Sequence, residues 1–298
     1  MSYAAALTAS SAIIAPIIPP SIIMIIYALT DNSVSVIGLF LAGIVPGLLL
    51  GLSLLATNWW ISRQRNFSFP MARPAWGQFL RESWKVIPAL LMPVIILGGI
   101  HGGVFTPTEA SAVAAVYALV VGRFVIGTLR FDQLPKILVN TAIMTSAVLL
   151  VISMASIFAY MLTVLQIPQS VSTWIGGLGL SPTMLLIVIS AFLLICGLFL
   201  DTLPAVIILV PILAPLAQSA GIDPLHFGMI LILNLSIGMI TPPVGAVLFV
   251  VTVVAKVPIF TLTRAILPML LAVTIVFVLI VFVPELSLWL PNTLGYSR

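Results

Sequence analysis

The sequence predicts an all-α polytopic membrane protein with an inverted repeat, broken helices and a re-entrant hairpin. Hydrophobic residues make up 62% of the 298 residues and charged residues only 6%, and the mean hydropathy is +1.32. A soluble domain of this length could not cover itself with so few charges. Two further observations support the fold class: a proline pair that occurs twice in apolar sequence, and an interrupted apolar block at 183–217.

The two proline pairs indicate one structural unit written twice. The pairs at 19–20 and 242–243 each lie in an apolar segment, and about 25 residues later a third proline follows, at Pro46 and Pro268. Proline has no amide N–H, and a membrane protein breaks a spanning helix only where something polar uses the freed backbone groups. Broken helices at matching positions of two halves point to the ion and substrate site of a secondary transporter.

Seven apolar runs have the length of membrane-spanning helices. They cover residues 7–30, 36–62, 86–103, 108–129, 137–165, 225–255 and 258–283. The block 183–217 is too long for one span of about 20 residues and short for two spans with a loop. We therefore expect a re-entrant hairpin whose tip lies at GLFLDTLP, from Gly197 to Pro204.

Positive charges predict the orientation. If the hairpin returns to its own side of the membrane, three basic loops fall on one face, which the positive-inside rule makes cytoplasmic. The basic residues are Arg63, Arg65, Arg73, Arg81, Lys85, Arg123, Arg130, Lys136 and Lys256. An aromatic belt is expected at the same interface, formed by Trp59, Trp60, Trp76 and Trp84. The loops around four acidic residues then face outward, at Asp31, Glu109, Asp223 and Glu285.

This layout divides the chain into four parts. Residues 1–62 form the C-terminal part of the first repeat, 63–85 a cytoplasmic basic loop, 86–283 the second repeat and 284–298 an outer tail. The second repeat has three spans, the hairpin, the broken helix and a last span, whereas only 18 residues precede the first proline pair. If the copies are equivalent, roughly 140 residues are missing from the front. The alternative is an asymmetric protein without the first hairpin.

The second break is the richest candidate site. An interruption from Gly238 to Pro243 leaves carbonyl groups without amide partners, and such carbonyls are hard oxygen ligands suited to a small cation. Thr241 adds a hydroxyl oxygen. A simple kink that satisfies its backbone against neighbouring helices is the competing interpretation. The first break, from Ala15 to Pro20, would be a sister site.

Asp201 is the only acidic residue predicted deep in the membrane, which makes it a functional candidate. Together with Thr202 it either caps the second limb of the hairpin or shapes the field around a bound ion. Asn234 either bridges two helices or is a satisfied structural amide. Two further motifs predict helix starts, one at Thr106 to Glu109 and one at Asp223-Pro224, beside His226.

No catalytic triad, nucleotide-binding loop or zinc-protease pattern is present, so we expect neither an enzyme nor a bound cofactor or transition metal. The formal charge of +4 is scattered along loops and gives no sign of nucleic-acid binding. The leading hypothesis is an ion-coupled uptake protein. A membrane-embedded enzyme that uses Asp201 is a second hypothesis, weakened because one carboxylate is a poor catalytic set. A structural or non-functional fragment is a third.

Three long stretches carry a family resemblance. They are IHGGVFTPTEASAVAAVYALVVG at 100–122, GLFLDTLPAVIILVPILAPLAQSAGIDPLHFG at 197–228 and NLSIGMITPPVGAVLFV at 234–250. They resemble the large membrane subunit of tripartite ATP-independent periplasmic (TRAP) transporters, and IIPPSIIMIIYALT and LFLAGIVPGLLL fit the same family. The resemblance begins partway into the family's pattern, after the first hairpin.

The resemblance implies an elevator-type importer of organic acids, such as dicarboxylates, sugar acids or sialic acids, coupled to sodium ions in the bacterial inner membrane. The implied partners are a small membrane subunit, separate or fused, and a periplasmic substrate-binding protein. The family's sodium pattern matches, at the second site, Gly197, Gly238, Thr241 and Val244. At the first site it matches the backbone carbonyls of Ala15, Ile18 and Pro20, without the partners that the first hairpin supplies.

Overall fold

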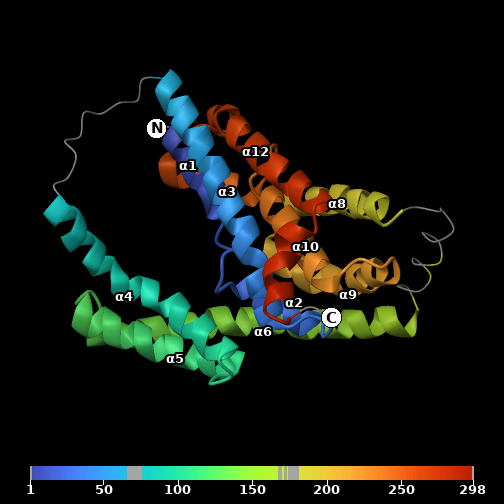
Figure 1. Cartoon of the computed structure of the whole chain (residues 1–298), viewed down its shortest axis with the longest axis horizontal. Helices are drawn as coiled ribbons and strands as arrows, with labels where there is room; N and C mark the ends of the chain where they lie inside the picture. Colours follow the sequence, from blue (N-terminus) through green and yellow to red (C-terminus); the bar gives the residue numbers. More distant parts are fainter. Residues whose placement is uncertain (1, 66–75, 167–169, 171–172, 174–180, 297–298) are drawn as a thin grey trace. The chain divides into compact units, whose positions relative to one another are not determined.

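The computed structural model describes residues 2–65, 76–166, 170, 173 and 181–296. Every regular element within these ranges is helical, as predicted (Figure 1). Six of the described helices are long and apolar enough to cross a membrane, so the protein is an all-α polytopic membrane protein. Contacts divide the chain into unit 1, residues 1–66 and 151–298, and unit 2, residues 67–150.

Unit 1 is organised around one central helix. Its complete helices are α1 (Ser2–Ala12), α2 (Ile22–Thr30), α3 (Val36–Gln64), α8 (Pro182–Phe199), α9 (Thr202–Ser219), α10 (Pro224–Gly238), α11 (Ala246–Ala255), α12 (Ile259–Phe282) and α13 (Glu285–Thr293). Every residue of α10 from Leu225 to Gly238 is buried. Helices α8, α9, α12, α3 and α13 pack against it, and an apolar sequence without a polar face is what such a position requires.

The structure contains both breaks and the hairpin. Residues 13–21 separate α1 from α2, residues 239–245 separate α10 from α11, and each proline pair contains a cis peptide bond. The third prolines lie inside the following helices, Pro46 in α3 and Pro268 in α12. Helices α8 and α9 form a hairpin joined by two residues, Leu200 and Asp201. Each limb has 18 residues.

The predicted helix starts are confirmed. Asp223 precedes Pro224, and its Oδ1 accepts the backbone N–H groups of Leu225 (2.8 Å) and His226 (3.2 Å). Helix α5 (Pro107–Val120) begins with a capping box, in which the Thr106 hydroxyl accepts the N–H of Glu109 and the Glu109 carboxylate accepts the N–H of Thr106. Both arrangements satisfy amides that would otherwise lack partners in the first turn.

The two ends of unit 1 differ in charge. The Tyr3 hydroxyl donates to Asn58 Oδ1 at 2.7 Å, and the Arg65 guanidinium lies 5.9 Å from the Tyr3 ring centre, so the start of α1 lies beside the end of α3. Figure 1 draws the start of α12 at the same end. At the other end of α3, Gln218 Nε2 donates to Ser33 Oγ (2.9 Å) and to Asp31 Oδ2 (3.4 Å), which joins the end of α9 to the α2–α3 turn.

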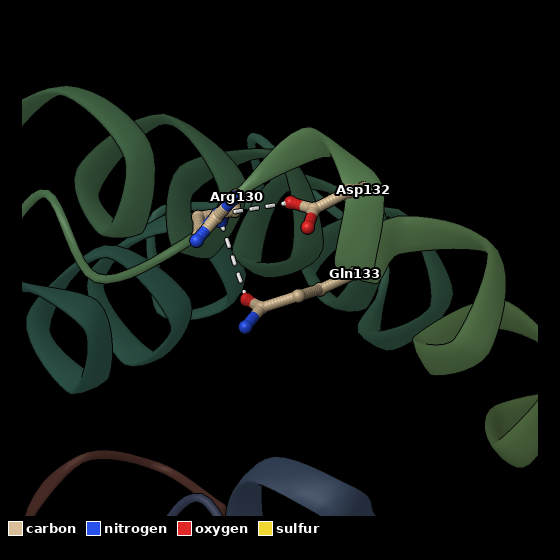
Figure 2. Close-up of polar contacts among 3 residues, drawn as sticks. All are labelled: Arg130, Asp132 and Gln133. Carbon is tan, nitrogen blue, oxygen red and sulfur yellow. Dashed lines mark hydrogen bonds and ion pairs between the residues drawn. The ribbon is translucent and has the colours of Figure 1, made fainter.

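Unit 2 contains α4 (Trp76–His101), α5, the π-helical turn η1 (Val121–Val125), the short η2 (Phe131–Gln133) and most of α6 (Leu134–Val164). The Tyr117 hydroxyl donates to the carbonyl of Pro88 at 2.6 Å and ties α5 to α4. Figure 2 shows the turn before α6, where Arg130 Nε lies 3.2 Å from Asp132 Oδ1 and Gln133 Oε1 accepts the Arg130 backbone N–H. The ion pair is exposed and contributes at most about 1 kcal/mol.

Two boundaries differ from the sequence prediction. The span predicted at 86–103 belongs to a helix that begins at Trp76, so part of the predicted basic loop 63–85 is helical. Arg81, Glu82 and Lys85 lower the hydropathy of this segment, although Arg, Glu and Lys are good helix formers. The predicted outer tail 284–298 contains helix α13, which packs against α3. Arg73, one of the predicted loop cations, lies outside the described residues.

Asp223 provides a test of the α10 start. Asp223→Ala removes the acceptor of two amides, and we expect a loss of about 1 kcal/mol of stability, seen as a lower melting temperature of the detergent-solubilised protein. Asp223→Asn keeps a side-chain oxygen and is expected to retain most of the wild-type stability. Gly51→Ala in α3, where no atom lies within 4 Å of the added Cβ, serves as the control. A melting temperature of Asp223→Ala equal to that of Gly51→Ala would contradict this assignment.

Candidate functional site

The candidate site lies where the hairpin tip meets the second break. Helix α8 ends at Phe199, and Leu200 and Asp201 are both in extended conformation before α9 begins at Thr202. The Thr202 side chain is buried, and its hydroxyl lies 2.9 Å from Met239 Sδ, the first residue of the break. The hairpin tip and the broken helix are therefore joined by a side-chain contact as well as by packing.

Two glycines bring the backbones of α8 and α10 together. A Cβ atom on Gly238 would lie 2.6 Å from the Cα of Gly197 and 3.0 Å from its carbonyl oxygen. A Cβ atom on Gly197 would lie 2.9 Å from the carbonyl oxygen of Leu235. These distances are shorter than real Cβ contacts, so only glycine allows the approach at both positions. The structure therefore brings Gly197 and Gly238 into direct contact.

The break leaves several carbonyl groups without amide partners. Val247 donates its N–H to the Met239 carbonyl (3.1 Å), and Thr241 donates to the Gly238 carbonyl (3.0 Å). Among the backbone hydrogen bonds of the described residues, none reaches the carbonyl oxygens of Ile240, Thr241 or Val244. The Gly197 carbonyl also receives no backbone N–H there, because the chain after it turns into the extended tip. Neutral oxygen atoms are thus available on both sides of the glycine contact.

Thr241 keeps its hydroxyl close to the α10 backbone. Its Oγ1 donates to the Ile237 carbonyl at 2.8 Å, which leaves the oxygen lone pairs free to accept or to bind a cation. Gly245 has φ +24°, and a Cβ there would lie 2.9 Å from the Thr241 carbonyl oxygen. Val244, the fourth residue of the family pattern, is half-buried on the same break.

Asn234 bridges two helices. Its Nδ2 donates to the Ser190 carbonyl of α8 at 2.8 Å, and the side chain is 1% exposed. The amide therefore joins α10 to α8. The bond lies one turn before Gly238, so the polar bridge and the glycine contact hold α8 to the same end of α10.

Asp201 does not act as the predicted side-chain cap. It occupies the N-cap position of α9, but its side chain makes no capping hydrogen bond and is exposed. The first amides of α9 are consequently left without that cap.

The first break is built differently. Ala15, Ile18 and Pro20 are all exposed. Ser21 stabilises the turn, because its hydroxyl donates to the Pro16 carbonyl at 2.7 Å and it caps α2. The Ile17 carbonyl packs so closely against Gly43 of α3 that a Cβ there would overlap it. The predicted residues therefore share one break, but no hairpin among the described residues covers them.

Sequence reasoning missed several contacts that shape the site. Thr202 and Met239 are 37 positions apart, and Asn234 and Ser190 are 44 positions apart. No local sequence pattern predicts contacts over such separations. His226, beside the predicted helix start, is buried, with Nδ1 2.7 Å from Ser287 Oγ on α13. Among the described residues, no group of three or more His, Cys, Asp or Glu side chains could hold a metal ion.

Comparison with known proteins places this geometry in a family. Residues 1–286 match the model of the DctM component of tripartite ATP-independent periplasmic transporters. The chain is 42% identical to the C4-dicarboxylate TRAP transporter large permease protein DctM of Pseudomonas aeruginosa, over 99% of this chain and 69% of that protein. It is 40% identical to the sialic acid TRAP transporter large permease protein SiaM of Vibrio cholerae, over 99% of this chain and 69% of that protein. It is 42% identical to the 2,3-diketo-L-gulonate TRAP transporter large permease protein YiaN of Escherichia coli, over 96% of this chain and 67% of that protein.

The glycine contact yields a direct test. Gly197→Ala inserts a methyl group against the α10 backbone, and overpacking of this kind costs about 1–3 kcal/mol. We expect a lower melting temperature than wild type. Gly51→Ala in α3 is the matched control, because no atom lies within 4 Å of its added Cβ. Equal melting temperatures for the two variants would show that α8 and α10 do not approach as described.

Proposed function

The chain belongs to the DctM family of tripartite ATP-independent periplasmic transporters, and from this premise we propose that it is the large permease subunit of a sodium-coupled uptake system for an organic acid. It is a transport protein and not an enzyme, since its relatives are named as transporter permeases. The observation that carries the proposal is the contact of Gly197 with Gly238 beside carbonyl oxygens that no amide uses.

The substrate class is supported by what the relatives transport. The relatives are named for C4-dicarboxylates, sialic acid and 2,3-diketo-L-gulonate, all of which carry a carboxylate. We place the substrate carboxylate near the first turn of α9, whose Thr202 and Leu203 amides have no side-chain cap. The positive end of a helix dipole favours an anion there.

A sodium ion fits the second break chemically. The oxygens available are the carbonyls of Gly197, Thr241 and Val244, one remaining lone pair on the Gly238 carbonyl and the Thr241 hydroxyl. All are neutral and hard, which suits a small monovalent cation better than a transition metal. In this proposal, sodium supplies positive charge beside the hairpin tip, and Gly197 and Gly238 keep the two backbones close enough to share it.

The charge distribution supports the proposed orientation in the bacterial inner membrane. Arg63 lies in the last turn of α3 and Arg65 follows its end, whereas Asp31 lies before its start. A helix of 29 residues separates them by about 40 Å. The positive-inside rule then places the Arg63 end in the cytoplasm. On the outer side we propose that a periplasmic binding protein delivers the substrate, with a small membrane subunit as the third component.

The hairpin provides a topological test. We propose that residues 199–203 stop short of the cytoplasmic surface, although each limb has enough residues to cross a bilayer. In a Cys196→Ser background, single cysteines at 199–203 should resist a large impermeant thiol reagent applied from the cytoplasmic side. Gln64→Cys, at the end of α3, should react readily. Ready labelling at the hairpin tip in every state would refute the re-entrant arrangement.

Thr241 provides the functional test. Thr241→Val keeps the shape but removes the hydroxyl oxygen, and loss of one such ligand is worth about 1–3 kcal/mol, or roughly 5- to 150-fold in apparent sodium affinity. Thr241→Ser restores the oxygen and should restore the affinity. The measurement is substrate uptake against sodium concentration, in proteoliposomes that contain the small subunit and the binding protein.

The same experiment separates the alternatives. If the prolines merely kink the helix, Thr241→Val should transport with an unchanged sodium dependence, and the side chain is then not a ligand. If wild-type proteoliposomes accumulate no organic acid under a sodium gradient, the chain behaves as a structural or non-functional fragment. Accumulation without sodium would instead refute sodium coupling while leaving the permease assignment in place.

A further inference from the structure

A groove on unit 1 contains two buried polar groups that the fold leaves without partners. It has a volume of about 300 Å³ and lies between α8, α10 and α12. Its walls include Ser190, Asn234, Thr241, Leu270, Thr274 and Phe277. We call it the lateral groove. Ser190 and Asn234 both form part of its wall, and their buried atoms Ser190 Oγ and Asn234 Oδ1 have no hydrogen-bond partner.

The orientation of the Asn234 amide is fixed by its bond to α8. The Ser190 carbonyl can only accept, so the group 2.8 Å away must be the donating Nδ2 of Asn234. Oδ1 therefore occupies the other side of the amide, as an acceptor without a donor. The side chains of Asn234 and Ser190 are only 1% and 8% exposed. Buried polar groups of this kind normally have a partner, so each requires an explanation.

The remaining polar groups of the groove define what it can bind. The Thr241 and Thr274 hydroxyls already donate to the carbonyls of Ile237 and Leu270, both at 2.8 Å. The groove thus offers several acceptors and one free donor, the Ser190 hydroxyl. An anion would meet mostly acceptors, and no charged side chain lines the groove to balance an ion. The complementary group is a neutral hydroxyl, which can donate to Asn234 Oδ1 and accept from Ser190 Oγ.

The rest of the groove wall is apolar, which suits contact with aliphatic chains. Leu270, Phe277 and Val278 form much of its wall, and Val278 is itself exposed on α12, a helix long and apolar enough to span the membrane. Ser190 is the ninth of the 18 residues of α8, so the polar groups lie about halfway along this limb of the hairpin. A ligand that reaches them from the side must travel through hydrocarbon.

We propose that the lateral groove binds a neutral, single-chain amphiphile whose hydroxyl group pairs with Asn234 and Ser190 and whose aliphatic chain lies along α12. The site is separate from the proposed substrate and sodium positions, although Thr241 borders both. An occupant would contact α8, α10 and α12 at once, next to the contact between Gly197 and Gly238. The binding itself does not depend on the proposed transport function.

Photolabelling of the permease complex in lipid nanodiscs tests the proposal. The probe is a dodecanol that carries a diazirine in its chain, and labelled peptides are located by mass spectrometry. We expect labelling on α8 around Ser190 and Leu194 and on α12 around Thr274 and Val278. Unlabelled 1-dodecanol should compete about tenfold better than dodecyl methyl ether, which cannot donate a hydrogen bond. Equal competition by the alcohol, the ether and dodecane would overturn the proposal.

Variants distinguish the groove from general lipid contact. Ser190→Ala removes only the hydroxyl and leaves the bond from Asn234 to the Ser190 carbonyl in place, so the protein should fold. Its preference for the alcohol over the ether should fall several-fold. Ser236→Ala is the matched control, because this buried hydroxyl donates within α10 and does not line the groove. Thr274→Leu fills the groove and should abolish specific labelling. Asn234→Leu also removes the bond to the Ser190 carbonyl, so a failure of this variant to fold leaves the test with the other two. Unchanged labelling and competition in Ser190→Ala and Thr274→Leu would overturn the proposal.

Discussion

The fold depends on the complete burial of α10, a helix that ends in a break and not in water. Because every residue from Leu225 to Gly238 is buried, the polar groups of this helix must find partners inside the protein. Asp223 satisfies its first amides and Asn234 bonds α8. At the last turn of α10, Gly238 has no side chain, and neither has Gly197 on α8, so the two backbones come into direct contact. The hairpin is therefore held to the broken helix by backbone contact at the point where carbonyl groups become available.

A site of this kind is made mostly of backbone, which explains its chemistry. Carbonyl oxygens are neutral and hard, and their positions follow from the path of the chain and not from side-chain rotamers. Glycine matters here because it has no Cβ, and proline because it has no N–H. Thr241 is the exception, since its hydroxyl donates to Ile237 and keeps its oxygen at the break. The hydroxyl thus adds a side-chain oxygen to a set of main-chain ones.

Hydropathy and proline spacing predicted the membrane class, the two breaks and the hairpin, because burial in lipid demands long apolar runs and because proline interrupts them. Cap chemistry predicted the starts of α5 and α10 for a similar local reason. The start of α4 was missed because its charged first turns are helical without being apolar, and α13 because it is short and packs on α3. For the candidate site, the residues followed from the family resemblance. Their contacts, such as Thr202 with Met239, depend on tertiary packing that no local pattern contains.

The two breaks show why similar local sequences do not make equal sites. Aligning the proline pairs places Ala15 with Gly238 and Ser11 with Asn234. Asn234 and Gly238 are buried against α8, whereas Ser11 on α1 and Ala15 in the first break are exposed. Both breaks contain a proline pair that removes amides, so both have carbonyl groups to offer. What differs is the neighbour: α8 presents Gly197 and the Ser190 carbonyl to the second break. At the proposed sodium site the α8 backbone approaches the break at Gly197, whereas the backbone that approaches the first break is that of α3, at Gly43.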